Sequence, residues 1–393
     1  MGGVSMETYK LSDLCEILDA KRKPLSALQR AKKQGIYPYY GAQGIIDHLD
    51  EYLLDGEYLL VAEDGANLET RNQPIANIAK GKIWVNNHAH VLGSNGKCPL
   101  NLLGFILNNM NISPYVTGCA QPKLNQENLR NIEIELPSHI DSIASILSSL
   151  DRKIELNNKI NADLEEMAQA IFKNWFVDFE PFKDGKFVDS ELGMIPEGWK
   201  VGRADDFYQI NIGKTPPRKE HKWFSTNPAD KIWVSIANMG NSGIFISDSS
   251  EYLTKEAVDR HNIIMVPRNT ILLSFKLTVG RVAIADKELT TNEAIARFIL
   301  SDDKYMEYLY LYLKNFDYNS LGSTSSIATA VNSKTIKGMQ MLQPSDKIID
   351  AFHIQVNPIF EKIRSLTKEN SRLSTLRDTL LPRLMSGELE VPE

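Results

Sequence analysis

Two long stretches of the chain carry apolar residues at intervals of three and four positions. This spacing places the apolar side chains on one face of an α-helix, and when sustained it predicts a coiled-coil seam. A helix of about 40 residues, at about 1.5 Å per residue, would span about 60 Å, so a spacer role is expected. The seam positions are Ile143, Leu147, Leu150, Ile154, Asn157, Asn161, Leu164, Ala168, Ile171 and Trp175 in the first stretch, and Phe352, Val356, Ile359, Ile363, Leu366, Asn370, Leu373, Arg377, Leu380 and Leu384 in the second.

Two asparagines, Asn161 and Asn370, fall on these seams at equivalent positions near the helix centres. A buried asparagine fixes register, because a shifted partner leaves its amide without a hydrogen bond. If the helices pair antiparallel, the two side chains could meet; the alternative is that Asn161 faces solvent. Pro358 is expected to kink or restart the second helix, and Pro382 to lie at a late kink or at the helix end.

The chain contains an internal repeat. Each half ends with a short helix, a loop rich in small residues, an asparagine-led turn, a strand, a proline and a long helix. The two halves share this order of elements but differ in the sequence between them. This suggests one scaffold that presents two different specificities. The matches are Lys153 with Lys362, Ile154 with Ile363 and Asn161 with Asn370 at an offset of 209, Asn109 with Asn315, Asn125 with Asn332 and Pro137 with Pro344 at offsets of 206 and 207, and, more loosely, Tyr9-Lys10-Leu11 with Trp199-Lys200-Val201.

The segments 9–136 and 199–343 contain short β-type runs with turns and short helices between them, which predicts a mixed α+β fold. Between the halves, Pro181, Gly193 and Gly198 indicate a loop up to about residue 198. The expected strands are Tyr58–Ala62, Lys82–Val85, Ile232–Ile236, Thr270–Phe275, Arg281–Ala285 and Arg297–Leu300.

The formal net charge of −6 argues at first against nucleic acid. Net charge, however, averages over surfaces that DNA would meet separately, and cations cluster in residues 21–33 and 214–222. Such clusters suit docking on phosphates, while the acidic remainder, including residues 46–69, limits non-specific adhesion. The alternative is that both clusters are solvated loops.

Side chains that can read base edges or contact phosphates lie in or near these clusters and in turns that follow strands. For each single asparagine, a turn that satisfies its own backbone is an equally good interpretation. The candidates for DNA contact are Lys21, Arg22, Lys23, Lys32, Lys33, Asn87, His88, Gln121, Lys123, Lys214, Arg218, Lys219, Lys222, Asn292, Ser323 and Ser325.

Motifs for catalysis or cofactor binding are missing across several chemistries. Gly213-Lys214-Thr215 resembles the end of a P-loop, but Tyr208 stands where that motif requires glycine. His88 and His90 lack a convincing third ligand, so satisfied or solvent-facing histidines are expected rather than a metal site. The Asp/Asn-Pro-Pro-aromatic tetrad of an amino-methyltransferase is also absent. We therefore expect no catalytic centre, no cofactor and no metal.

The cellular setting follows from what the chain lacks. No stretch approaches 18 consecutive apolar residues, and the first ten residues lack the apolar core of a signal peptide. Cys15, Cys98 and Cys119 have no metal-type spacing and are odd in number. A cytoplasmic protein with reduced thiols and no membrane association is expected.

Four short segments, at 146–154 (ILSSLDRKI), 174–179 (NWFVDF), 195–199 (IPEGW) and 380–389 (LLPRLMSGEL), border or lie within the long helices. Together with the repeat, they resemble the specificity subunits of type I restriction–modification systems over nearly all of the chain. Regions that read DNA vary in such families, so the resemblance does not support the candidates residue by residue.

The resemblance implies two target-recognition domains, each reading half of a split site in double-stranded DNA, with an antiparallel helix pair as the ruler. It also implies assembly with two modification subunits, which bind S-adenosylmethionine and methylate adenine, and with restriction subunits that use ATP. None of these cofactors is expected to bind this chain. The implied divisions are target-recognition domains at 1–137 and 199–343, spacer helices at 138–180 and 344–393, and a connector at 181–198.

Two other classes of function stay open. The first is a stand-alone DNA-modifying or DNA-cleaving enzyme with unrecognised motifs, which would methylate or cut DNA unaided. The second is a coiled-coil scaffold that binds only proteins, against which a steep loss of DNA affinity with salt would count.

Overall fold

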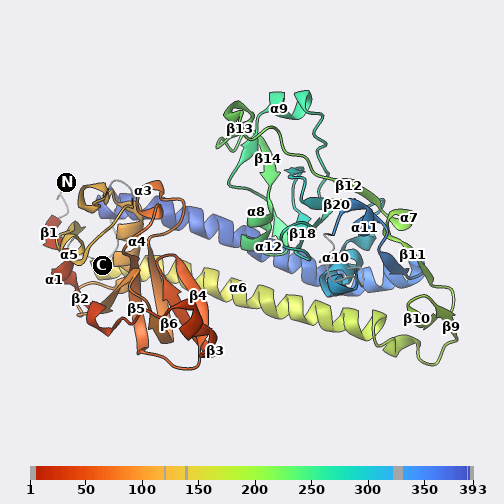
Figure 1. Cartoon of the computed structure of the whole chain (residues 1–393), viewed down its shortest axis with the longest axis horizontal. Helices are drawn as coiled ribbons and strands as arrows, with labels where there is room; N and C mark the ends of the chain where they lie inside the picture. The colour runs from red at the N-terminus through yellow and green to blue at the C-terminus, as the bar shows by residue number, and fades with distance from the viewer. Residues whose placement is uncertain (1–5, 119–120, 138–139, 322–330, 387, 390–393) are drawn as a thin grey trace. The chain divides into compact units, whose positions relative to one another are not determined.

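The computed structural model describes residues 6–118, 121–137, 140–321, 331–386 and 388–389. It forms two compact units, one of Met1–Ile154 with Arg372–Glu393 and the other of Glu155–Ser371. The two long helices, α6 (Ile140–Phe176, yellow in Figure 1) and α12 (Asp346–Met385, blue), contribute residues to both units. Each unit therefore combines a globular segment with one part of each long helix.

The first unit contains a six-stranded sheet in the order β2-β7-β5-β6-β3-β4, and a separate pair of β1 with β8. Its elements before α6 are β1 (Met6–Lys10), α1 (Leu11–Leu14), β2 (Cys15–Ile17), η1 (Asp19–Lys21), α2 (Ala27–Ala31), β3 (Gln34–Gly41), β4 (Gly44–Leu49), β5 (Leu54–Ala62), α3 (Asn67–Thr70), β6 (Ala76–Val85), β7 (Ala89–Ser94), α4 (Leu100–Asn109), η2 (Ser113–Tyr115), α5 (Gln126–Arg130) and β8 (Glu133–Pro137).

The second unit contains a five-stranded sheet in the order β12-β20-β17-β18-β15, a four-stranded sheet in the order β13-β16-β14-β19, and a pair of β11 with β21. Its elements between the long helices are η3 (Glu180–Phe182), β9 (Phe187–Ser190), β10 (Gly193–Pro196), β11 (Lys200–Arg203), α7 (Ala204–Phe207), β12 (Gln209–Ile212), η4 (His221–Trp223), β13 (Phe224–Ser225), β14 (Lys231–Val234), α8 (Ile236–Asn241), β15 (Phe245–Ile246), β16 (Tyr252–Leu253), α9 (Lys255–Arg260), β17 (Ile271–Ser274), β18 (Val282–Ala285), β19 (Thr290–Thr291), β20 (Ile295–Ile299), η5 (Asp303–Tyr305), α10 (Met306–Asn315), η6 (Tyr318–Leu321), α11 (Ser333–Lys337) and β21 (Gln340–Gln343).

The central sheets of the two units share one topology, so the repeat predicted from the sequence is present in the fold. Strands β2, β7, β5 and β6 pair antiparallel in the same order as β12, β20, β17 and β18. In both sheets the next strand, β3 or β15, joins in parallel. Outside the sheets, the β1–β8 pair corresponds to the β11–β21 pair.

The start of each half shows a residue-level correspondence that differs from the expected one. The carboxylate of Asp13 accepts the backbone N–H of Lys10, and that of Asp206 accepts the backbone N–H of Arg203, both at 3.2 Å. Lys10 therefore corresponds to Arg203, not to Lys200 as the loose sequence match suggested. The sequence match aligned aromatic and apolar residues, whereas the feature that the two halves share here is the carboxylate that caps the short helix.

The long helices pair antiparallel, as expected. In the second unit, Asn157 of α6 donates to Asn370 of α12 at 2.9 Å, while Phe176 packs on Phe352 with 4.8 Å between ring centroids. Later residues of α6 thus face earlier residues of α12. In the first unit, Arg377 bonds Asp151 at 2.8 Å in the same register.

The asparagine contact differs from the expected one. Asn370 accepts from Asn157 and donates to Asn158 at 2.8 Å, while Asn161 lies about one turn farther along α6. The Oδ1 atom of Asn161 is buried without a hydrogen-bond partner. Sequence offset alone misplaced the pair, because equivalent positions in two antiparallel helices face each other only at the centre of the repeat.

The second helix is continuous through Pro358, so the expected restart is wrong. Val356 and Phe360, on either side of Pro358, are fully buried, and this packing supports the helix where the proline removes a backbone donor. The helix ends at Met385, three residues after Pro382, in agreement with the expected position of the end.

The connector also differs from the expected loop, because β9 and β10 form a hairpin within it. Val188 pairs with Ile195, which is buried, and Gly193 takes up the positive φ of +88° at the turn. Phe182 packs against Trp199 with 5.1 Å between ring centroids. The helix before this connector ends at Phe176.

Each globular segment packs on the beginning of the helix that follows it and on the end of the other. In the first unit, Ile143 and Leu147 of α6 join the core with Leu381 and Leu384 of α12. In the second unit, the corresponding core is formed largely by aromatic residues, among them Phe172, Phe176, Phe352 and Phe360. No helix within the described ranges is long and apolar enough to cross a membrane.

Candidate nucleic-acid interface

In the first unit, four chain segments meet where β2 and β5 end and β7 begins. They are residues 18–23, 63–65, 86–88 and 121–124. The backbone N–H of Glu63 donates to the carbonyl of His88 at 2.9 Å, and that of Leu124 donates to the carbonyl of Glu63 at 2.8 Å. The main chain therefore holds together segments that are far apart in the sequence.

A buried charge network lies beneath these segments. Arg22 bonds Glu63 at 2.5 Å and approaches Asp19 at 3.3 Å. Asp19 also lies 2.6 Å from Nδ1 of His90, whose Nε2 lies 2.7 Å from the carbonyl oxygen of Leu124. Burial raises the pKa of Asp19, but the hydrogen bond and charge of His90, the backbone N–H of Val91 and the charge of Arg22 together hold this pKa below its usual range. The ionised carboxylate thus anchors the network.

Asp19, Glu63 and His90 place three potential metal-ligand atoms within 4.8 Å of one another. Among the described residues, this is the group whose spacing could hold a metal ion. The Arg22 guanidinium already bonds both carboxylate side chains, and both ring nitrogens of the fully buried His90 have partners. His90 is thus a buried histidine whose two ring nitrogens both have hydrogen-bond partners. The sequence could not reveal its partners, because they are 71 and 34 residues away.

Several candidates for DNA contact lie around this network. Asn87 and His88 are exposed in the turn between β6 and β7, and His88 Nδ1 lies 2.7 Å from Asp64. Lys123 is half-exposed and pairs with Glu63 at 3.2 Å, and the neighbouring Gln121 is exposed. These four side chains come from the segments 86–88 and 121–124 and lie on the exposed surface around the buried network.

The basic segment 21–33 divides into two parts. Lys21 and Lys23 are exposed beside Arg22, and the Lys23 ammonium lies 6.0 Å from the centre of the Trp84 ring. Lys32 and Lys33 instead follow α2, where Lys33 pairs with Glu51 at 2.7 Å. Among the described contacts, none links Lys32 or Lys33 to the segments 63–65, 86–88 and 121–124.

The corresponding end of the second unit is formed by the loop after β12 and the segment before β20. Gly213 donates to the carbonyl of Ile295 at 3.0 Å, and Lys214 to that of Thr291 at 2.9 Å. A Cβ on Gly213 would lie 1.9 Å from the carbonyl oxygen of Asn292, so only glycine permits this approach. Asn292 itself accepts the backbone N–H of Ala294 at 3.1 Å, as expected of a turn-forming asparagine.

Arg218 is a cation of this loop that packs against two aromatic rings. Its guanidinium lies 4.3 Å from the centre of the Phe224 ring and 4.5 Å from that of Trp233. Both of its terminal nitrogens bond Glu251, at 2.7 and 3.1 Å. Stacking and a bidentate ion pair hold the side chain in one orientation, although it is about half exposed.

The remaining candidates of the second unit have different surroundings. The Lys222 ammonium lies 4.3 Å above the Trp223 ring, Lys219 is exposed, and Lys214 donates to the carbonyl of His261 at 2.5 Å. Ser323 and Ser325 lie outside the described residues. Both basic clusters predicted from the sequence thus follow equivalent strands, β2 and β12.

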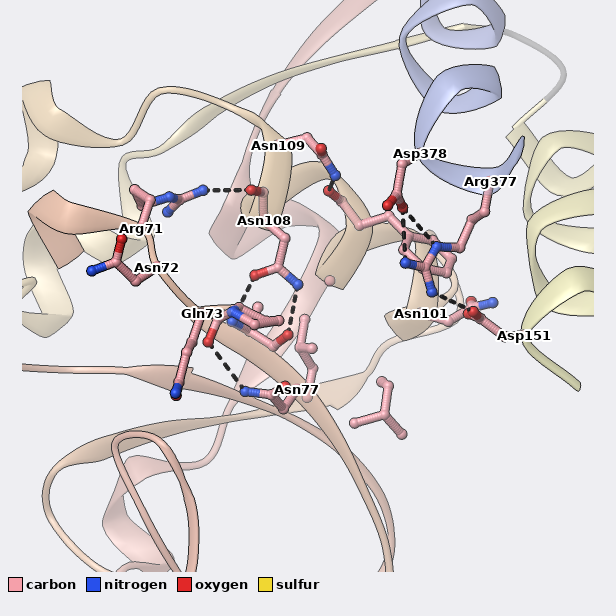
Figure 2. A pocket seen from close by; sticks show the side chains of 16 residues that line it. Arg71, Asn72, Gln73, Asn77, Asn101, Asn108, Asn109, Asp151, Arg377 and Asp378 are labelled. Carbon is pink, nitrogen blue, oxygen red and sulfur yellow. Dashed lines mark hydrogen bonds and ion pairs between the residues drawn. The ribbon is translucent and has the colours of Figure 1, made fainter. Parts of the chain in front are cut away.

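Outside this interface, the first unit contains a cavity of about 450 Å³ between α4, residues 71–78 and the two long helices. Figure 2 shows Arg377 there between Asp151 and Asp378. Gly104 lines this cavity, whereas the matching position of α10 carries Tyr310, which packs on Phe360 with 5.6 Å between ring centroids. In the second unit, the aromatic rings of Tyr310 and Phe360 therefore occupy the space that corresponds to the cavity of the first unit.

The family model for the type I restriction modification DNA specificity domain matches residues 3–166 and again 196–355. The chain belongs to this family. Each matched range of the specificity domain covers one globular segment and part of the long helix that follows it. The unit of the repeat in this specificity protein is therefore a globular segment with its helix.

Relatives of this specificity protein carry matching names. It is 28% identical over 331 residues to the type I restriction enzyme HindI specificity subunit of Haemophilus influenzae, covering 68% of this chain and 71% of the relative. It is 32% identical over 288 residues to the MjaIX specificity subunit of Methanocaldococcus jannaschii, covering 70% and 65%. The fold resembles that of the S subunit from M. genitalium, with a TM-score of 0.55, 13% identity and coverage of 100% and 98%.

Proposed function

We propose that this chain is the DNA sequence-specificity subunit of a type I restriction–modification complex, in which each globular half reads one part of a bipartite site. The observation that carries this proposal is the equivalent placement of the two basic loops, after β2 and after β12, at matching ends of two sheets with one topology. Duplicated readers on a common scaffold are what a site in two parts requires.

The readers that we propose in the first half are Lys21, Lys23, Asn87, His88, Gln121 and Lys123. In the second half they are Lys214, Arg218, Lys219 and Lys222, with Ser323 and Ser325 retained as candidates from the sequence. Arg22 and Asn292 are assigned positioning roles, because their polar groups already bond the chain itself. Lys32 and Lys33 remain candidates for phosphate contact outside the cluster.

Carboxylates lie at the proposed DNA-binding surface of each half. They suit a specificity domain that must reject most DNA sequences. Lys123 pairs with Glu63, and Arg218 with Glu251, so a phosphate or base must displace an internal partner to be bound. A partly exposed pair such as Arg218 with Glu251 contributes only about 0–1 kcal/mol, so a well-placed DNA group can replace it. The net charge of −6 adds a general repulsion from DNA that correct contacts overcome.

The chemistry of the complex is assigned to partner subunits. Members of this family are named specificity subunits, and the chain supplies recognition rather than a catalytic centre. We propose two modification subunits as partners, which bring S-adenosylmethionine and methylate adenine, and restriction subunits that bring ATP. Cys15 and Cys98 are free, buried thiols, which fits the reducing cytoplasm that we propose as the compartment.

The test is an exchange of residues 1–137 for the same segment of another family member, with the modification subunits co-expressed. Mapping methylated adenines should show that one half of the recognised site changes and the other is retained. The reciprocal exchange of residues 199–343 is the matched control and should change the other half. If either exchange altered both halves, the assignment of one reader to each half would be wrong.

A second assay distinguishes the other classes of function. The purified chain alone should neither methylate nor cut DNA, and the complex should bind DNA with an affinity that falls steeply as salt rises. Unaided methylation or cleavage would identify an enzyme, and assembly without any DNA binding would identify a protein scaffold.

A further inference from the structure

One apolar side chain of the second unit is fully exposed. Leu277, between β17 and β18, is 99% exposed, and the next most exposed large apolar residue among those described is Leu28 at 79%. Isolated surface leucines are ordinary, but they usually keep part of their side chain against the protein. Leu277 also has a φ of +61°, a left-handed conformation that costs about 1–2 kcal/mol for a residue with a Cβ.

The loop that carries Leu277 is fixed by its own hydrogen bonds. The Ser274 hydroxyl donates to the carbonyl of Thr278 at 2.6 Å and accepts the backbone N–H of Arg281 at 3.0 Å. Gly280 donates to the carbonyl of Ser274 at 3.0 Å, and a Cβ on this glycine would lie 2.9 Å from the Tyr318 ring. The loop is closed at its base, so it presents the leucine in a defined position.

This loop belongs to the same strand end as the basic cluster of the second unit. Phe275 donates to the carbonyl of Ala294 at 3.0 Å, next to Glu293, whose carboxylate accepts from the Thr215 hydroxyl. Burial raises the pKa of Glu293, but its hydrogen bonds and the charges of Lys276 and Arg218 together hold that pKa below its usual range. The leucine therefore follows a lysine at the edge of the proposed DNA-reading surface.

We propose that Leu277 is a wedge that enters the base stack when the second half binds its half-site, a role that rests on the proposed function. Apolar wedges unstack a base step and kink the duplex, which brings more of the protein surface against DNA. Insertion buries a side chain that the free protein leaves in water, while Lys276 beside it is placed for a backbone phosphate. The site would favour a flexible pyrimidine–purine step, because such steps unstack most easily.

The experiment uses the complex of this chain with its modification subunits and a duplex carrying the site defined by methylation mapping. 2-Aminopurine, which fluoresces when unstacked, is placed at successive positions of the second half-site, excluding the methylated adenine, because modification enzymes extrude their target base. The variants are Leu277→Ala and Leu277→Gly, with Leu277→Met as the conservative replacement. Leu28→Ala, at the exposed leucine of the first half, is the matched control.

Wild-type protein, Leu277→Met and Leu28→Ala should raise fluorescence at one step of the second half-site. Leu277→Ala and Leu277→Gly should abolish that signal and lower affinity about tenfold, the scale expected when a buried leucine side chain is truncated. Unchanged fluorescence and affinity in Leu277→Ala would overturn the inference. Loss of assembly with the modification subunits in Leu277→Ala would also overturn it, since Leu277 would then contact protein. Absence of DNA binding by the wild-type complex would instead refute the proposed function itself.

Discussion

At the residue scale, Asp19 is the acceptor on which the strand-end network of the first unit depends. Besides His90 and Arg22, it accepts the backbone N–H of Val91 at 3.0 Å and the side-chain amide of Gln126 at 3.1 Å. These partners come from separate segments of the chain. One buried carboxylate therefore positions the turn that carries Asn87 and His88.

Asp19→Asn should lower the free energy of unfolding at pH 7 by about 3 kcal/mol, because it leaves His90 and Arg22 without their buried carboxylate. The pKa of Asp19 is lowered in the folded chain, so its stabilisation is present above the unfolded value of about 3.9 and is lost as pH falls through the folded pKa. Urea unfolding between pH 7 and pH 3 measures both effects. The exposed Asp55→Asn should change stability by less than about 0.5 kcal/mol, and an equal loss in both variants would contradict the assignment.

Also at the residue scale, Lys219 is an exposed cation in the loop after β12. If it neutralises one phosphate, Lys219→Ala should reduce the slope of log affinity against log salt by about 1, with a similar loss across sequences. A salt titration of DNA binding by the complex gives this slope. Lys186→Ala, in the connector, should leave this slope unchanged. Equal slopes for the two variants would show that Lys219 does not contact DNA phosphate.

At the element scale, the helix pair has an asymmetric polar contact. The Oδ1 atoms of Asn157 and Asn161 are both buried without a partner, but the Nδ2 group of Asn157 donates to Glu369 and to Asn370, the repeat equivalent of Asn161. Asn161→Leu should therefore raise stability by about 1 kcal/mol, since an unsatisfied buried group is removed. Asn157→Leu should lower it by about 1 kcal/mol, because Asn370 loses its donor. Urea unfolding compares the two, and changes of the same sign would contradict this account.

The sequence predicted most elements but few of their contacts. Apolar periodicity and the repeat gave the long helices, the strands at 58–62 and 82–85 and the order of elements before each proline, because these depend on local patterns. The partner of Asn370 depends on the register between antiparallel helices, and the network of Asp19, Glu63 and His90 on sheet topology. The sequence analysis did not single out Leu277, because apolar periodicity does not indicate the exposure or the backbone conformation of a single loop residue.

At the scale of the whole molecule, we propose that α6 and α12 set the separation of the two DNA half-sites. Both helices cross from one compact unit to the other without a break, α6 between Ile154 and Glu155 and α12 between Ser371 and Arg372. Near these borders, Asn157 bonds Asn370 within the second unit and Arg377 bonds Asp151 within the first. A length change must therefore be made in both helices to preserve both contacts.

An insertion of seven residues at each border should keep the apolar seam in phase and add about 10 Å to the helix pair. At about 3.4 Å per base pair, the spacer between the half-sites should lengthen by about three base pairs, with both half-sites unchanged. Methylated-adenine mapping measures the new spacing. An insertion in one helix only should abolish methylation, because it shifts Asn157 away from Asn370. A double insertion that remains active with the original spacing would show that the helices hold the complex together without measuring the site.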